Sequence, residues 1–217
     1  MGLDQGTTRI MGQTTSRMLF DYWNTLRGRR AAPERFEIEP AKIASLLPET
    51  FIIECGGLLS YRFRLAGTRI CEQFGRELRG LDFTQLWNPS DREAVGNLLH
   101  SIVTESAIGA MTFDGMTRED CAAPFELLLL PLVHAGTRVN RIMGCITAID
   151  PPYWLGTQPL IRLAVRSIDL DWVGAHAGAN HRAAPAPSNI GGRQATAPGD
   201  SKRRFRVFDG GLSDRTD

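Results

Sequence analysis

The chain lacks the short motifs that mark common enzyme active sites. It has no HExxH metalloprotease motif, no GxSxG nucleophile turn and no P-loop among its 217 residues. It also lacks the phosphoacceptor context of a histidine kinase and any signature of a cyclic-nucleotide synthase. We therefore expect a protein that is not an enzyme.

Cysteine is scarce, with four residues spread widely along the chain: Cys55, Cys71, Cys121 and Cys145. No two of them form a CxxC pair, which argues against zinc, c-type haem and thioredoxin-like sites. Each lies in or beside an apolar run, where a free cysteine behaves as a small hydrophobic side chain. We interpret them as reduced core thiols of a cytoplasmic protein.

Long apolar runs and an excess of one charge are also missing. Because no run reaches 18 apolar residues, the sequence predicts no membrane span. The net charge is +1, so no field of the whole chain attracts nucleic acid or a membrane surface. Hydrophobic residues make up 42% of the chain, enough for the core of one domain of about 130–150 residues with appendages.

The chain divides into five segments by composition and pattern. We expect residues 1–15 to be a disordered lead-in, residues 16–36 to form a helix and a linker, and residues 37–156 to form the main domain. Residues 157–173 alternate apolar and polar side chains and can add a strand. Residues 174–217 are rich in Ala, Gly, Pro and Arg, which predicts a mostly disordered tail.

Near the N-terminus, large apolar residues recur at helical spacing. Ser16 can cap the start of this helix and Gly28 can end it. Its apolar face needs a cover, either the sheet of its own domain or a second copy of the chain, and we expect it to support a homodimer. The residues of this face are Met18, Leu19, Tyr22, Trp23 and Leu26.

The main domain reads as strands split by helices. Residues 51–55 and 61–65 predict an antiparallel hairpin, and a short helix follows from Thr68 to Gly75, where glycine suits a left-handed end. A capping-box pattern at residues 90–93 starts a long apolar helix. Three more strands are predicted over residues 109–116, 125–133 and 141–150.

This order predicts an α+β fold with one five-stranded antiparallel sheet and helices on one face. The apolar run Leu127 to Leu130 is typical of a strand that is covered on both sides. A five-stranded sheet covered by a long helix has a concave face, which can hold a small ligand.

Several segments also resemble a known family. They are IEPAKI (38–43), FIIE (51–54), YRFRLAGT (61–68), FGRELRG (74–80) and ELLLLPL (126–132). These segments resemble the PAS domain family, in particular a stand-alone PAS subfamily found mainly in alphaproteobacteria. The resemblance implies a PAS-like fold and a sensory or regulatory role in bacterial signalling, through a small molecule, dimerisation or a protein partner.

Two polar residues, Arg64 and Glu126, are the most informative candidates in the concave face. If both point into it, they can pair or bind a polar ligand, and Arg64 would help to hold an anionic metabolite. If they point outward, they form an ordinary surface pair. The full set of pocket candidates is Arg64, Cys71, Phe74, Trp87, Leu99, Met111, Phe113 and Glu126.

The concave face has a second interpretation. If bulky side chains fill it, the chain is a structural module for protein interaction or dimerisation rather than a ligand sensor.

No cofactor or metal is expected. His100 lies roughly 150° from the apolar stripe of its helix, so it should face water rather than ligate haem. Cys71 stands in ICEQF, which departs at most positions from the NCRFLQ type of motif in flavin photosensors. His176 and His181 are five residues apart, with no further metal ligands nearby.

The basic cluster at residues 202–206, KRRFR, is the one local feature that could contact nucleic acid, anionic lipid or an acidic partner. Short charge runs are usually solvated, so nucleic-acid binding is not expected. The expected partners are a second copy, a signalling protein and an unidentified small molecule.

Overall fold

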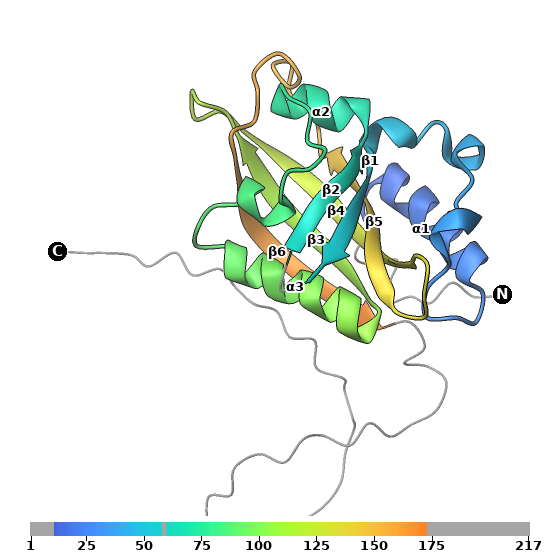
Figure 1. The fold of residues 1–217 in the computed structure, drawn as a ribbon. Coiled ribbons are helices and arrows are strands. Elements are labelled where there is room, and N and C mark those ends of the chain that lie inside the picture. The colour runs from blue at the N-terminus through green and yellow to red at the C-terminus, as the bar shows by residue number, and fades with distance from the viewer. Residues whose placement is uncertain (1–10, 58–59, 173–217) are drawn as a thin grey trace, which may run out of the picture.

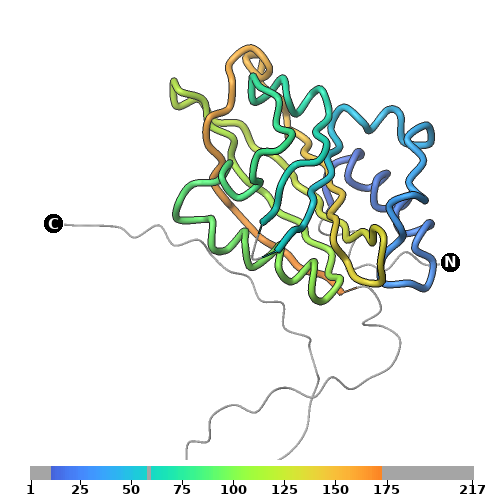
Figure 2. Tube along the Cα trace, in the orientation of Figure 1, coloured from blue at the N-terminus to red at the C-terminus, as the bar shows by residue number. Residues whose placement is uncertain are grey.

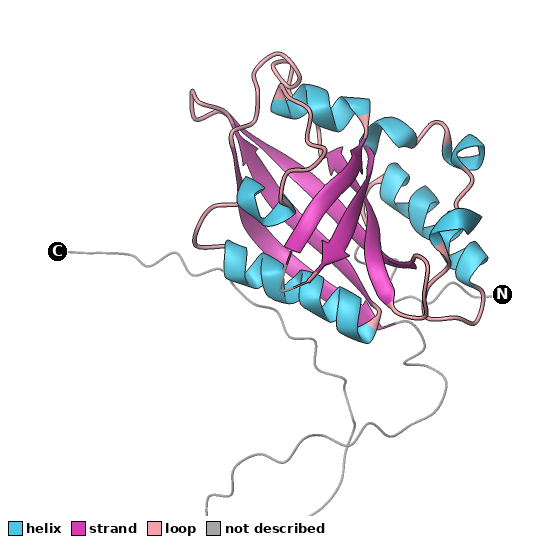
Figure 3. Ribbon diagram, viewed as in Figure 1, coloured by secondary structure: helices cyan, strands magenta, loops and turns pink. Residues whose placement is uncertain are grey.

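The computed structural model describes residues 11–57 and 60–172. Short helices cover both faces of one twisted sheet (Figures 1 and 3). In chain order the elements are α1 (Thr14–Arg27), η2 (Arg35–Glu37), η3 (Pro40–Ile43), η4 (Leu47–Glu49), β1 (Thr50–Gly56), β2 (Ser60–Ala66), α2 (Thr68–Phe74), η5 (Phe83–Leu86), α3 (Arg92–Glu105), β3 (Ala107–Met116), β4 (Ala122–Val133), β5 (Val139–Ala148) and β6 (Arg162–Trp172).

The strands lie in the order β2-β1-β5-β4-β3-β6, and every neighbouring pair is antiparallel. This confirms the predicted α+β fold with an antiparallel sheet. The sheet has six strands because the segment predicted to add a strand forms β6, which pairs with β3 at the edge.

The sheet separates two apolar cores. We call the face covered by α2, η5 and α3 the inner face, and the face covered by α1 and residues 31–49 the outer face. Along β4, Leu127 and Leu129 belong to the inner core, whereas Leu128 and Leu130 belong to the outer core. Cover on both sides explains why this strand is apolar throughout, as its sequence predicted.

The first helix packs on the outer face of its own chain. Leu19 and Trp23 are fully buried there, and the Trp23 indole N–H donates to the carbonyl oxygen of Pro131 in β4, 2.9 Å away. Gly28 ends the helix with a positive φ, as predicted. Ser16, however, lies inside the helix rather than at its cap, and its hydroxyl group faces the thiol of Cys145.

A bulge in the first hairpin changes which side chains point inward. Ile53 pairs with Phe63 and Ile52 pairs with Leu65, so Arg64 is an extra residue in β2. Phe63 lies in the inner core, but Leu65 falls on the other side and is 42% exposed. The simple alternation of a strand over residues 61–65 would put Tyr61, Phe63 and Leu65 on one face, and the bulge removes Leu65 from it.

Two glycines have clear structural reasons. Gly75 ends α2 in the left-handed conformation that its position predicted, with φ 61°. A Cβ at Gly67 would collide with the carbonyl oxygens of Leu47 and Pro48, so only glycine lets the chain between β2 and α2 pass η4 this closely.

The long helix α3 forms as predicted, but its expected capping box does not. Asp91 makes no side-chain cap bond. Its carboxylate instead accepts a hydrogen bond from the Val165 amide in β6, at 2.9 Å.

Loop segments cover backbone positions at both edges of the sheet. At the β2 edge, the amide of Phe63 donates to Leu81, and its carbonyl oxygen accepts from Gly80. At the β6 edge, the carbonyl oxygen of Leu163 accepts from the Asn88 amide, and Asp91 binds Val165. The trace in Figure 2 shows that the connection between α2 and α3 runs from one edge to the other.

No helix within residues 11–57 and 60–172 has both the length and the apolar composition that a membrane crossing requires.

Candidate functional site

The inner face is the candidate site, and a row of aromatic rings occupies it. Neighbouring ring centroids along this row are 5.1–5.8 Å apart. The rings come from four strands and from the connection around η5, and each is at most 2% exposed. The six residues are Phe51, Phe63, Phe83, Trp87, Phe113 and Phe125.

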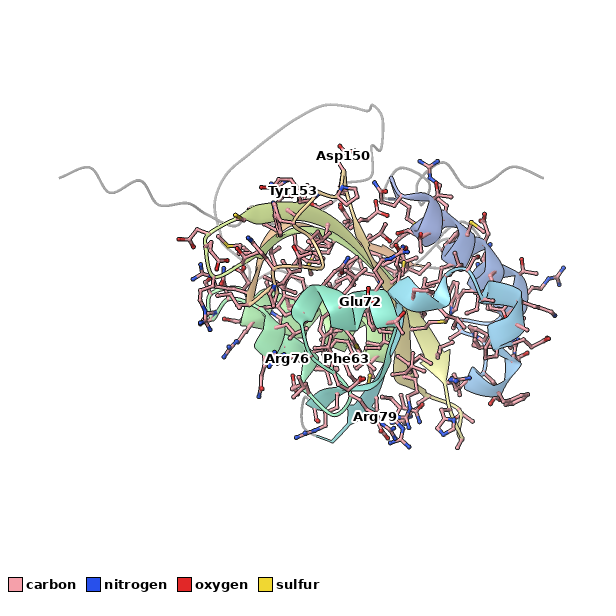
Figure 4. All side chains as sticks on the ribbon, turned by 90° about the horizontal axis from the view of Figure 1, so that it is seen from above. Phe63, Glu72, Arg76, Arg79, Asp150 and Tyr153 are labelled. Carbon is pink, nitrogen blue, oxygen red and sulfur yellow. The ribbon has the colours of Figure 1, made fainter. Side chains whose placement is uncertain are left out.

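The geometry of these contacts is that of a packed core. Phe113 and Phe125 stack with an interplanar angle of 9°, and Trp87 meets Phe113 edge to face at 5.1 Å. Both arrangements are favourable for aromatic pairs. Around Phe63, side chains occupy the space between α2 and the sheet (Figure 4).

Five of the eight predicted pocket residues meet in this inner core: Phe74, Trp87, Leu99, Met111 and Phe113. A sixth, Cys71, packs against the edge of the core from α2 and is only partly buried. Four rings of the row were not among the candidates: Phe51, Phe63, Phe83 and Phe125. Three of them lie in predicted strands, and Phe83 lies in the connection before the long helix.

Arg64 does not reach the inner face. As the extra residue of the bulge, it is exposed on β2, and β1 and β5 lie between β2 and the β4 strand of Glu126. Three strand spacings amount to about 14 Å, too far for an ion pair. Arg64 and Glu126 therefore meet neither in the concave face nor as a surface pair, and both alternatives for this pair are wrong.

Glu126 points to the outer face and binds the start of α1. The exposed fraction of Glu126 is only 4%. Its carboxylate accepts from the Gly12 amide at 2.6 Å and from the Gln13 amide at 3.3 Å. A carboxylate at a helix N-terminus satisfies free amides and complements the helix dipole. This residue therefore holds the first helix on the sheet instead of facing a ligand.

The five residues proposed for dimerisation are divided by this packing. Leu19 and Trp23 are buried against the sheet of their own chain, so they are not available to a second copy in this arrangement. The Tyr22 hydroxyl group accepts from the Glu39 amide, and Leu26 packs partly into the outer core. Only Met18 is substantially exposed, at 49%.

Burial controls the chemistry of the thiols. It raises the pKa of both Cys55 and Cys145 to about 12. Burial likewise raises the pKa of Cys71, whose sulfur lies 3.7 Å from a Glu77 carboxylate oxygen. All four cysteines are free. The raised pKa values leave little thiolate on Cys55, Cys71 and Cys145 near neutral pH, so these three thiols are poor nucleophiles.

His100 is exposed, as the helix geometry predicted. Within the described part of the chain, no three His, Cys, Asp or Glu side chains are grouped so that they could hold a metal ion. His176, His181 and the cluster at residues 202–206 lie outside the described residues.

The aromatic row contains one polar atom without a hydrogen-bond partner. The indole nitrogen of Trp87 is buried, and no hydrogen-bond acceptor among the described residues reaches it. An unpaired buried donor costs about 1–3 kcal/mol. This N–H is the one group of the aromatic row that a purely apolar core leaves without a hydrogen-bond acceptor.

The molecule also has hollows outside the inner core. One of about 700 Å³ lies between residues 30–34, the end of α3 and the connection from β4 to β5. Another of about 320 Å³ is lined by residues of η5 and its neighbours, including Arg76 and Arg92.

Exposed side chains mark other parts of the surface. Tyr153 is almost fully exposed and lies in the same loop as Asp150, as Figure 4 shows.

The described architecture is an antiparallel sheet whose concave face is covered by short helices and one long helix, with the first helix on the opposite face. A family model described as "PAS domain" matches residues 11–147, which is more than half of the chain. The chain therefore belongs to the PAS domain family, and a general role in sensing or regulation follows from that membership. No curated protein matches it.

Proposed function

We propose that this chain is a non-catalytic regulatory protein that acts through contacts with a protein partner rather than through a ligand in its concave face. The observation that carries this proposal is the row of six aromatic rings in the inner core. Ring separations of 5.1–5.8 Å and near-zero exposure are properties of a filled interior. A PAS domain without an internal ligand transmits signals through its surfaces.

Native mass spectrometry of freshly purified full-length protein tests the proposal. We expect the mass of the bare polypeptide, or of an integral number of copies, with no small-molecule adduct. A stoichiometric adduct that survives gentle ionisation and disappears on denaturation would contradict the proposal. The same spectrum reports whether the protein forms a dimer.

A second function, a sensor of a small molecule, is favoured by the Trp87 indole N–H. This donor is buried without a protein acceptor, and a ligand oxygen or nitrogen could accept from it. The ligand would have to displace part of the aromatic row, because Trp87 contacts both Phe83 and Phe113.

The variant Trp87→Phe separates the two functions, because it keeps an aromatic ring and removes the donor. For a filled interior, the free energy of unfolding should change by less than about 1 kcal/mol, because removal of the unsatisfied donor offsets the packing lost with the smaller ring. For a sensor, the variant should lose a co-purifying adduct that the native chain retains. Phe113→Leu, which leaves the donor in place, is the control.

A further inference from the structure

The hollow of about 700 Å³ is a groove with an apolar floor, and it lies outside the inner core. Ala32 and Val139 are buried at its base, and Val103 and Val133 contribute partly buried side chains. Its walls come from three separate segments: residues 30–34, residues 103–106 and residues 133–139. A groove of this size can accept a peptide segment with a few large apolar side chains.

The charges at the rim are not equivalent. Arg30 is already engaged, because its guanidinium donates to Glu37 at 2.8 Å and to the Leu26 carbonyl oxygen at 2.6 Å. Arg138 is exposed and forms no ion pair within residues 11–57 and 60–172. Glu34 supplies the acidic group of the lining. The groove therefore suits a segment that carries both signs of charge.

The chain leaves the described fold beside this groove. Trp172, the last described residue, pairs with Ala107, and its indole N–H donates to the Glu105 carboxylate at 2.8 Å. Ser106, between these two residues, lines the groove. In Figures 1 and 2 the end of β6 lies next to the end of α3.

Among the residues after Trp172, apolar side chains are concentrated in one place. Phe205 and Phe208 are the only Phe, Tyr or Trp residues between positions 173 and 217, and Val207 stands between them. Three basic residues, Lys202 to Arg204, precede them, and Asp209 follows.

We propose that the segment 202–209 binds in the groove of its own chain. Phe205 and Phe208 cover the apolar floor, the basic residues lie toward Glu34, and Asp209 lies toward Arg138. The 32 residues from 173 to 204 can span on the order of 100 Å when extended, so chain length does not prevent the contact. Tethering raises the local concentration of the segment toward the millimolar range, so a weak contact is enough.

Hydrogen exchange on the full-length chain tests this from the side of the groove. The probes are the backbone amides of residues 135–138, the exposed loop between β4 and β5. In the variant Phe205→Asp/Phe208→Asp, we expect exchange in this loop to become at least about fivefold faster than in the native chain. The control Ser188→Asp/Asn189→Asp adds the same charge elsewhere in the tail and should leave the rates unchanged.

Limited trypsin digestion tests it from the side of the segment. If the segment is bound in the groove, trypsin should cut after Arg204 and Arg206 at least about fivefold more slowly in the native chain than in the variant Ala31→Trp. In that variant the new side chain fills the groove. Ala31 is exposed, so this change does not disturb the core. Ala94→Trp places the same side chain at an exposed alanine on the first turn of α3, away from the groove, and should behave as the native chain.

Equal loop exchange in all variants, together with equal cutting of the segment, would overturn the proposal. Protection that appears only as protein concentration rises, with a dimer in sedimentation analysis, would also overturn binding within one chain and would assign the groove to a second copy.

Discussion

Phe83 tests most directly whether the concave face is filled. It is fully buried, and its ring contacts Phe51, Phe63 and Trp87 at centroid distances of 5.5–5.8 Å. Replacing it with alanine removes the central ring of the row and leaves a cavity that the rigid sheet cannot close. Core Phe→Ala substitutions cost about 3–5 kcal/mol, and the number of ring contacts places Phe83→Ala near about 4 kcal/mol.

Urea unfolding followed by circular dichroism measures this loss. With an m-value of about 2 kcal/mol/M, the midpoint should fall by about 2 M. The control is Phe36→Ala, because Phe36 is 79% exposed and its loss should change stability by less than about 0.5 kcal/mol. A Phe83→Ala midpoint as high as that of Phe36→Ala would refute the filled interior, since it would show that the face tolerates empty space.

Four further outcomes follow from other contacts. Glu126→Ala should lower the free energy of unfolding by about 2 kcal/mol, because the Gly12 amide loses its charged acceptor; thermal melts against the native chain check this. Gly67→Ala should reduce stability by more than about 2 kcal/mol or prevent folding, since its Cβ would meet the backbone of Pro48; a normal melt would contradict the close approach. Cys145 should react with iodoacetamide at pH 8 on the order of a thousandfold more slowly in the native protein than in urea, because burial raises its pKa from about 9 to about 12 and leaves it protonated. For the same reason, ionisation of this thiol in the unfolded chain should begin to destabilise the fold above about pH 9, which pH-dependent melts of the native chain and of Cys145→Ala would detect.

Local patterns predicted the elements well because each pattern has a local cause. The apolar stripe of α3 and the left-handed end at Gly75 depend on residues within a few positions of one another. The additional strand at the C-terminal side of the domain was visible in its alternation for the same reason. These features need no knowledge of what packs against them.

The face to which a polar residue points was harder to predict. β4 is apolar on both sides, so its pattern does not reveal whether Glu126 faces inward. In β2, the bulge at Arg64 reverses the alternation of inward and outward side chains, and no residue type in the strand predicts this bulge. The partner of Glu126 is the start of α1, 113 to 114 positions away, which only the assembled fold brings close.

The capping-box pattern failed for a related reason, and its cap residue Ser90 lies one position before the observed N-cap, Asp91. Asp91 has the right residue type and position to cap α3, yet it binds the Val165 amide of β6 instead. A side chain that can satisfy a local amide or a distant one takes the partner that tertiary packing offers.

The connection between α2 and α3 joins opposite edges of the sheet. Its residues 80–82 bind β2 at one edge, residues 88–91 bind β6 at the other, and Phe83 and Trp87 fill the face between them. The connection thus links the two edge strands across the full width of the sheet, so a displacement of η5 would move both of them together. Since it also occupies backbone groups on those strands, a partner cannot extend the sheet by strand addition at Phe63 or Leu163.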